Sequence, residues 1–179
     1  MKTLHLIRHA KSSWTDSSLK DEQRPLKNRG INDCKLMPPA LSEHKSVIGR
    51  IFCSPAQRAQ STIKTFLTHT NTNTGTNLNW STDKDLYTFR AYDLLKWWQH
   101  RNDAFNHITQ VGHNPGMPYF IEHLKGESIR NLSTCGYTQL IFNGHHWSNS
   151  SADSCQLATF ITPNQLKYNW SQHKWIQYP

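Results

Sequence analysis

Two histidines and two arginines, whose side chains suit anions, follow apolar runs along this chain. His9, preceded by Arg8, directly follows one run, and His113 follows a second run just after a glycine. A third run leads into a turn that carries Arg58. In an open parallel sheet, ligands bind outside the carboxyl ends of the strands. We therefore expect the three turns to share one edge of a sheet and to form an anion site that contains a possible nucleophile.

Histidine is a competent nucleophile near neutral pH because its unperturbed pKa is about 6.5. Its attacking nitrogen must be unprotonated, so the other ring nitrogen has to donate a hydrogen bond. Taken alone, a histidine at a strand end is more often a satisfied structural residue, and Arg58 could lie on a solvated helix face. Arg58, however, lies one turn after Pro55, a favourable residue at a helix start. Because arginine forks and helix N-termini both suit phosphate, the combination favours an anion site.

Several ordered segments resemble the SixA-type phosphohistidine phosphatases of the histidine phosphatase superfamily. The first runs over residues 6–14 (LIRHAKSSW), and it is followed by 24–26 (RPL) with Arg29-Gly30. The later segments are 54–58 (SPAQR), 111–116 (VGHNPG) and 160–163 (FITP). The resemblance extends over nearly the whole chain in the expected order.

The resemblance implies a covalent mechanism. His9 would attack phosphorus to form a phosphohistidine, which water then hydrolyses. Arg8, Arg58 and His113 would bind the phosphoryl oxygens and stabilise the charge of the transition state. Neither a metal nor an organic cofactor is expected.

Three further residues are candidates with an ordinary alternative. Lys11 and Arg24 could line the outer pocket, or they could form surface ion pairs. Asp85, in a segment similar to the acidic-Leu-Tyr segment of many relatives, is the best carboxylate for a proton donor, or it could simply cap the next helix. Esters expel an alkoxide and need such a donor, which contributes on the order of 100-fold. Phosphohistidine expels an imidazole and needs it less.

We therefore expect a phosphatase that removes phosphate from a phosphohistidine-bearing signalling or phosphotransfer protein. The alternative within the superfamily is a small-molecule phosphomonoesterase; a mutase is disfavoured because its acidic motif has no match. From a different class, the chain could be a non-catalytic module that binds phosphate or phosphoproteins. The intact set Arg8, His9, Arg58 and His113 argues against that module.

Composition fits one soluble domain over residues 1–179. The chain is 36% hydrophobic with a mean hydropathy of -0.72. It has no run of the roughly 20 apolar residues that a membrane helix needs and no secretory signal. Four widely spaced cysteines suggest reduced, buried thiols in a cytoplasmic protein. The net charge of +8 favours anions, but scattered basic residues and the lack of a recognition motif argue against nucleic acid.

Strand and helix patterns alternate, which predicts an α/β three-layer sandwich with a largely parallel central sheet, and the resemblance makes it phosphoglycerate mutase-like. The pattern predicts a helix over 28–43 that Pro38-Pro39 should kink or break. Residues 68–77 are expected to form a polar loop, and 138–142 and 156–161 to form strands. The basic and aromatic tail is expected to be a closing strand or helix.

Overall fold

The apolar runs form a single mixed sheet in the computed structural model, which describes residues 1–43, 48–74, 79–129 and 131–169. Within these residues the sheet has six strands in the order β3-β2-β4-β1-β5-β6. The strands are β1 (Lys2–Arg8), β2 (Arg50–Cys53), β3 (Trp80–Thr82), β4 (His107–Gly112), β5 (Tyr137–Phe142) and β6 (Cys155–Ile161). β1 to β4 pair in parallel, and only β5 runs against its neighbours. The expectation of a largely parallel sheet is confirmed.

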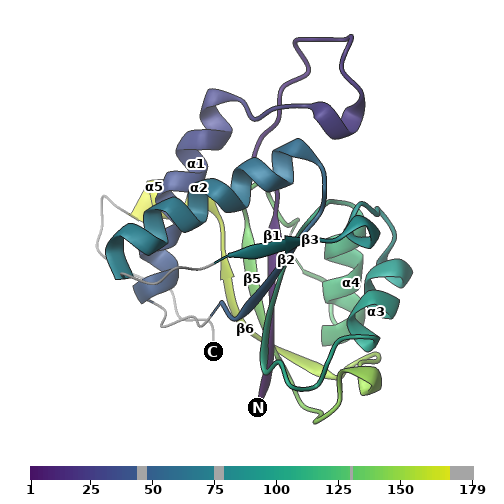
Figure 1. Ribbon diagram of the computed structural model, residues 1–179. Coiled ribbons are helices and arrows are strands. Elements are labelled where there is room, and N and C mark those ends of the chain that lie inside the picture. Colours follow the sequence, from purple (N-terminus) through teal and green to yellow (C-terminus); the bar gives the residue numbers. More distant parts are fainter. Residues whose placement is uncertain (44–47, 75–78, 130, 170–179) are drawn as a thin grey trace.

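Helices cover both faces of this sheet, which gives the three expected layers (Figure 1). α1 (Asn28–Glu43), α2 (Gln57–Thr74) and α5 (Pro163–Asn169) lie on one face, and α3 (Ala91–Gln99) and α4 (Gly116–Lys125) lie on the other. The described chain also contains the short 3-10 helices η1 (Asp21–Gln23), η2 (Lys84–Leu86) and η3 (Trp147–Asn149). None of the described helices is long and apolar enough to cross a membrane.

Alternate residues of the buried strands feed two apolar cores, one on each side of the sheet. Ile7 faces the core under α1 and α2, whereas Leu4 and Leu6 face the core under α3 and α4. Each helix contributes the apolar face that its 3.6-residue period predicts, including Ile63 of α2 and Phe120 of α4, both fully buried. The four cysteines are free and buried in these cores.

The expected break in α1 at Pro38-Pro39 is wrong, because the helix continues to Glu43. A proline inside a helix removes a backbone hydrogen bond and costs about 3 kcal/mol. Here Met37 and Ala40, which flank the pair, are buried in the core. Tertiary packing therefore holds the helix through a sequence that would end it in isolation.

The expected polar loop over 68–77 is also wrong for most of its length, because α2 extends to Thr74; residues 75–77 lie outside the described residues. Two threonines of α2 donate their hydroxyls to carbonyls of the helix itself. Thr65 donates to the carbonyl of Ser61, and Thr68 donates to that of Lys64, each at 2.9 Å. A threonine whose hydroxyl donates to the carbonyl four residues earlier is tolerated within a helix.

The C-terminal segment closes the first core, as expected for a covering helix. Leu166 of α5 is buried, and Lys167 forms an ion pair with the buried Asp33 of α1. The aromatic and basic residues of the tail beyond Asn169 lie outside the described residues.

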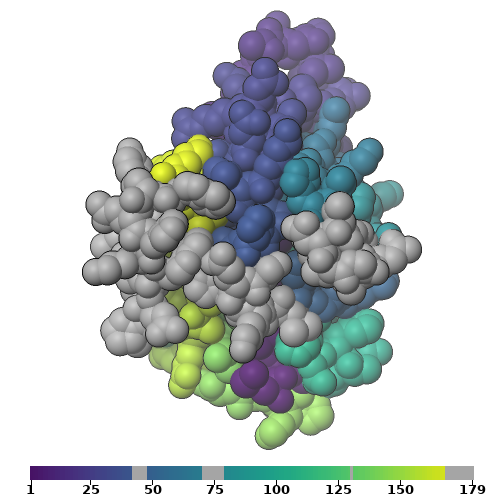
Figure 2. Space-filling view, turned by 90° about the vertical axis from the view of Figure 1, so that its left-hand side faces the viewer, coloured from purple at the N-terminus to yellow at the C-terminus, as the bar shows by residue number. Residues whose placement is uncertain are grey.

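Residues 12–27 form a projecting segment between β1 and α1 (Figures 1 and 2). Its two ends are tied together, because Ser13 N–H donates to Pro25 O at 2.8 Å and Lys27 N–H donates to Lys11 O at 2.9 Å. Gly30 of α1 packs against the backbone of Lys11, and a Cβ at Gly30 would lie only 2.9 Å from Lys11 N. The helix can approach the turn after His9 this closely only because residue 30 lacks a side chain.

We predict that Gly30→Ala pushes the turn away and misplaces His9. The expected loss in the free energy of unfolding is about 1–3 kcal/mol, as for overpacking of a buried site, together with a loss of activity. Chemical denaturation and initial rates measure the two effects. The neighbouring Arg29→Ala, which removes a 65% exposed side chain, serves as the control, and equal behaviour of both variants would contradict the prediction.

Candidate active site

Three adjacent strands end together and bring the predicted residues into one place. β1 and β4 pair so that Arg8 lies opposite Gly112, and the ladder continues as His9 N–H donates to Gly112 O at 3.0 Å. Ser54, just after β2, donates its N–H to Val111 O at 3.0 Å. As a result, the rings of His9 and His113 lie with their centroids 5.1 Å apart.

His9 is held in the form that a nucleophile requires. Its Nδ1 lies 2.8 Å from the carbonyl oxygen of Ala10, which can only accept, so Nδ1 carries the proton. Its Nε2 accepts a hydrogen bond from Arg58 Nε at 3.3 Å. Nε2 is therefore unprotonated, and its lone pair is directed to Arg58 Nε.

Burial lowers the pKa of His9 to about 4, against the opposing hydrogen bond to Ala10. The positive charges of Arg58 and Arg8 add to this decrease. The ring is therefore neutral at every pH near neutrality.

Arg58 is fixed by one carboxylate. It donates through Nη2 to Asp21 Oδ2 at 2.8 Å and through Nη1 to the carbonyl of Asp21. The same carboxylate accepts from Tyr87 Oη at 2.7 Å and from Arg24 Nη1 at 2.8 Å. Burial raises the pKa of Asp21, but the hydrogen bonds from Tyr87, Arg24 and Arg58 outweigh burial and hold that pKa well below its ordinary range. Asp21 is therefore ionised.

Two buried polar atoms beside His9 lack a hydrogen-bond partner among the described residues. Arg8 donates through Nη1 to Leu132 O at 2.7 Å, yet its Nε has no partner among the described residues. His113 bonds through Nε2 to Ser54 Oγ at 2.7 Å, yet its Nδ1 is equally without a partner within the described chain. An unpaired buried polar group costs about 1–3 kcal/mol. Arg8 lines the cavity of His9 and the ring of His113 lies beside that of His9, so an anion with several acceptor oxygens would suit both atoms if Nδ1 of His113 carries the ring proton.

A cavity of about 460 Å³ opens above His9. It is lined by Arg8, His9, Lys11, Ser12, Trp14, Asp21, Arg24, Arg58, Tyr87, Phe89, Asn114 and Thr134. The expected outer residues Lys11 and Arg24 both reach it. Trp14, at the rim, is 70% exposed, and Arg24 Cζ lies 3.1 Å from the centroid of its ring.

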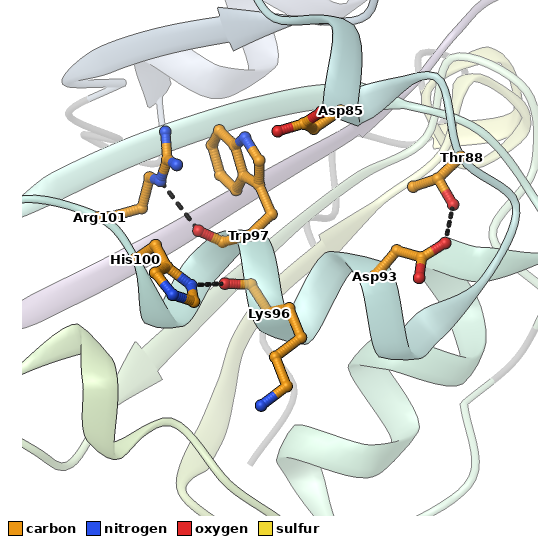
Figure 3. Close-up of a pocket in the computed structure, with 7 residues that line it drawn as sticks. All are labelled: Asp85, Thr88, Asp93, Lys96, Trp97, His100 and Arg101. Atoms are coloured by element: carbon orange, nitrogen blue, oxygen red, sulfur yellow. Dashed lines mark hydrogen bonds between the residues drawn. The ribbon is translucent and has the colours of Figure 1, made fainter.

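Asp85, the expected proton donor, lines a different cavity. This second cavity of about 370 Å³ is formed by Asp85, Thr88, Asp93, Lys96, Trp97, His100 and Arg101, and Figure 3 shows Asp85 at its edge. From the same acidic-Leu-Tyr segment, it is Tyr87 that lines the cavity of His9. The 3-10 turn η2 (Lys84–Leu86) accounts for the difference. Asp85 lies within this turn and faces the second cavity, whereas Tyr87, two residues later, faces the cavity of His9.

Asp21, Tyr87 and Thr62 are site residues that sequence reasoning missed. Thr62 Oγ1 accepts from Ala10 N–H at 2.9 Å and donates to Arg58 O at 2.6 Å, so it links the turn after His9 to the start of α2. Thr62 lies one helical turn after Arg58, and Asp21 lies three residues before Arg24. Both spacings were visible, but only the folded chain shows what these residues contact. Within the described residues, no group of three or more His, Cys, Asp or Glu side chains is arranged to hold a metal ion.

Comparison with known proteins agrees with this geometry. The model of the histidine phosphatase superfamily (branch 1) matches residues 4–132. An uncharacterized chloroplastic protein of Arabidopsis thaliana is 29% identical over 158 residues, which are 84% of this chain and 71% of the relative.

Solved structures share the fold. One is a phosphohistidine phosphatase SixA, described as putative, from Agrobacterium tumefaciens, with a TM-score of 0.75 and 20% identity over 90% of this chain and 98% of that one. A second is a protein histidine phosphatase SixA complexed with tungstate, with a TM-score of 0.75 and 19% identity over 92% of this chain and 99% of that one. The chain belongs to the histidine phosphatase superfamily, with SixA-type proteins among its structural neighbours.

We predict that His9 does not take up a proton near neutral pH. Because its pKa is lowered to about 4, its ring carbon and proton chemical shifts should stay constant from about pH 8 to about pH 5. Histidines of the urea-unfolded chain should instead titrate near 6.5. Two-dimensional NMR, with His9→Asn to assign the signal, makes the measurement. A midpoint near 6.5 in the folded protein would show that burial and the arginines do not control this ring.

Proposed function

We propose that this phosphatase acts on phosphohistidine, through a covalent intermediate on His9 and without a metal. The natural substrate would be a protein that carries phosphohistidine on an accessible surface. Family membership supports the phosphatase activity, and the exposed rim beside Trp14 suits a bulky substrate. The four free, buried thiols support a reducing compartment such as the cytoplasm.

One observation carries the choice of substrate. Asp21 is the only carboxylate among the described residues that line the cavity of His9, and three donors hold it in the ionised form. A carboxylate with a strongly lowered pKa cannot serve as a general acid near neutral pH. An alkoxide leaving group would thus depart without assistance, whereas an imidazole needs none once its ring is protonated.

The geometry supports the following sequence of bonds. The Nε2 lone pair of His9 attacks phosphorus while the P–N bond of the substrate breaks, and the substrate imidazole leaves in neutral form. Arg58 turns its Nε–H from His9 Nε2 to a phosphoryl oxygen as Nε2 becomes bonded to phosphorus. Water then attacks the same phosphorus, the bond to Nε2 breaks, and inorganic phosphate departs.

We expect His9→Ala to abolish turnover of a phosphohistidine protein. Rapid quenching with a labelled substrate should trap acid-labile phosphate on the wild-type chain but not on this variant. Full activity of His9→Ala would refute the covalent mechanism.

The leaving-group argument has its own test. We expect kcat/KM for a phosphohistidine peptide to exceed that for an alkyl phosphomonoester by about 100-fold or more. A general acid usually contributes about that factor, and the ester would lack one here. Asp85→Asn is the matched control: because Asp85 lines the second cavity, it should leave both rates within about twofold. Equal kcat/KM values for the two substrates, or a large loss in Asp85→Asn on the ester alone, would favour a general phosphomonoesterase.

Metal independence is tested by chelation. Activity should survive incubation with EDTA and 1,10-phenanthroline, and phosphate, sulfate and vanadate should compete with substrate because they present the same oxygens to Arg8 and Arg58. Loss of activity that a single divalent ion restores would contradict the metal-free mechanism.

A further inference from the structure

Ser54 lies fully buried behind the second catalytic histidine. It follows β2, and its Oγ lies 2.7 Å from Nε2 of His113. The sequence resemblance includes Ser54 but gives it no task, and it is not among the residues that line the cavity. Among the described residues, its Oγ forms hydrogen bonds only with His113 and with the backbone of Ala56.

The direction of the Ser54–His113 hydrogen bond follows from these neighbours. Ala56 N–H points to Ser54 Oγ at 3.4 Å and uses that oxygen as an acceptor. The single hydroxyl proton of Ser54 is then free to point at Nε2, the one partner of Ser54 Oγ in the described part of the chain that can accept it. Burial and the nearby His9 and Arg58 lower the pKa of His113 to about 3, so its ring is neutral and carries one proton.

If Nε2 accepts from Ser54, the proton of the neutral ring must lie on Nδ1. Nδ1 is the buried atom of His113 that has no partner among the described residues. His113 is only 1% exposed and is not itself among the residues that line the cavity, but its ring lies beside that of His9, with the two centroids 5.1 Å apart. The opposite tautomer would turn an Nδ1 lone pair, rather than a donor, toward a phosphoryl group that consists of acceptors.

We propose that Ser54 is a positioning residue that fixes the Nδ1–H tautomer of His113, so that Nδ1–H donates to the phosphoryl oxygen in the transition state. The inference rests on the proposed phosphatase function, but the tautomer itself can be measured without turnover. A neutral imidazole is a suitable donor here because it stabilises charge without delivering a proton to the leaving group. Ser54 thereby acts on the reaction only through His113.

The direct test is the tautomer of His113 in the wild-type protein. Long-range nitrogen–proton NMR on histidine-labelled protein distinguishes a protonated from an unprotonated ring nitrogen, and His113→Gln identifies the signals. We expect a protonated Nδ1 and an unprotonated Nε2. Addition of vanadate should shift the Nδ1 resonance while Nε2 stays unprotonated. A wild-type ring protonated on Nε2 would overturn the proposal whatever the substrate of the enzyme is.

The variants test whether Ser54 is the cause. Ser54→Ala should populate the Nε2–H tautomer and lower kcat for phosphorylation of His9 by on the order of 10-fold or more, with KM little changed, because the lost donor acts mainly in the transition state. Ser54→Thr keeps the hydroxyl and should restore both the tautomer and most of kcat. An unchanged tautomer and unchanged kcat in Ser54→Ala would refute the role of Ser54.

Ser150→Ala is the matched control. Ser150 is also a buried serine (1% exposed), but it follows η3 and bonds through its carbonyl to Gln99. Loss of its hydroxyl should move neither the His113 signals nor kcat. If wild-type enzyme does not transfer phosphate from phosphohistidine at all, the substrate assignment fails, and the tautomer measured with vanadate still decides the role of Ser54.

Discussion

The parallel pairing of β1 with β4, and of β4 with β2, is the constraint on which the site depends. Because Arg8 lies opposite Gly112 and Cys53 lies opposite Val111, three chain segments leave the sheet at one level. A shift of one residue in either register would turn alternate side chains to the other face of the sheet. The two apolar cores make such a shift costly, since the residues of β1 face opposite cores in turn. The burial of Leu6 and Ile7 on opposite faces thus fixes where His9 stands.

Around His9, positively and negatively charged side chains alternate. The neutral ring of His9 contacts Arg58, Arg58 contacts the ionised Asp21, and Asp21 contacts Arg24 and Tyr87. Arg58 and Arg24 therefore have an anionic partner before substrate arrives, whereas Nε of Arg8 has no partner among the described residues. This order keeps the pKa of the Asp21 carboxylate low, so Asp21 stays ionised although it lies close to His9.

Periodicity and local motifs were sufficient for the sheet, for the helix faces and for the prediction that Arg8, His9, Arg58 and His113 lie at one edge of the sheet, because each depends on short-range patterns. They failed where packing overrules local preference. Pro38-Pro39 stay inside α1 because Met37 and Ala40 are anchored in the core. Asp85 and Tyr87 were indistinguishable in the sequence as neighbours of the site, and the 3-10 turn between them decides which one faces His9. The role of Asp21 depends on contacts 37 and 66 residues away in the chain, which no local pattern contains.

The carboxylate of Asp21 also changes the electrostatic free energy that a phosphoryl group would gain on binding. In a pocket of unpaired arginines, an incoming dianion would neutralise bare positive charge, and its affinity would depend steeply on ionic strength. Here Arg58 and Arg24 already share Asp21 as an anionic partner, so under the proposed function the entry of phosphate would be an exchange of partners. The net electrostatic gain is smaller, and the same reduction applies to the departing phosphate. Such a pocket benefits an enzyme whose product anion binds more tightly than its substrate. After each turnover the carboxylate of Asp21 can pair again with Arg58 and Arg24 and so help to release the product.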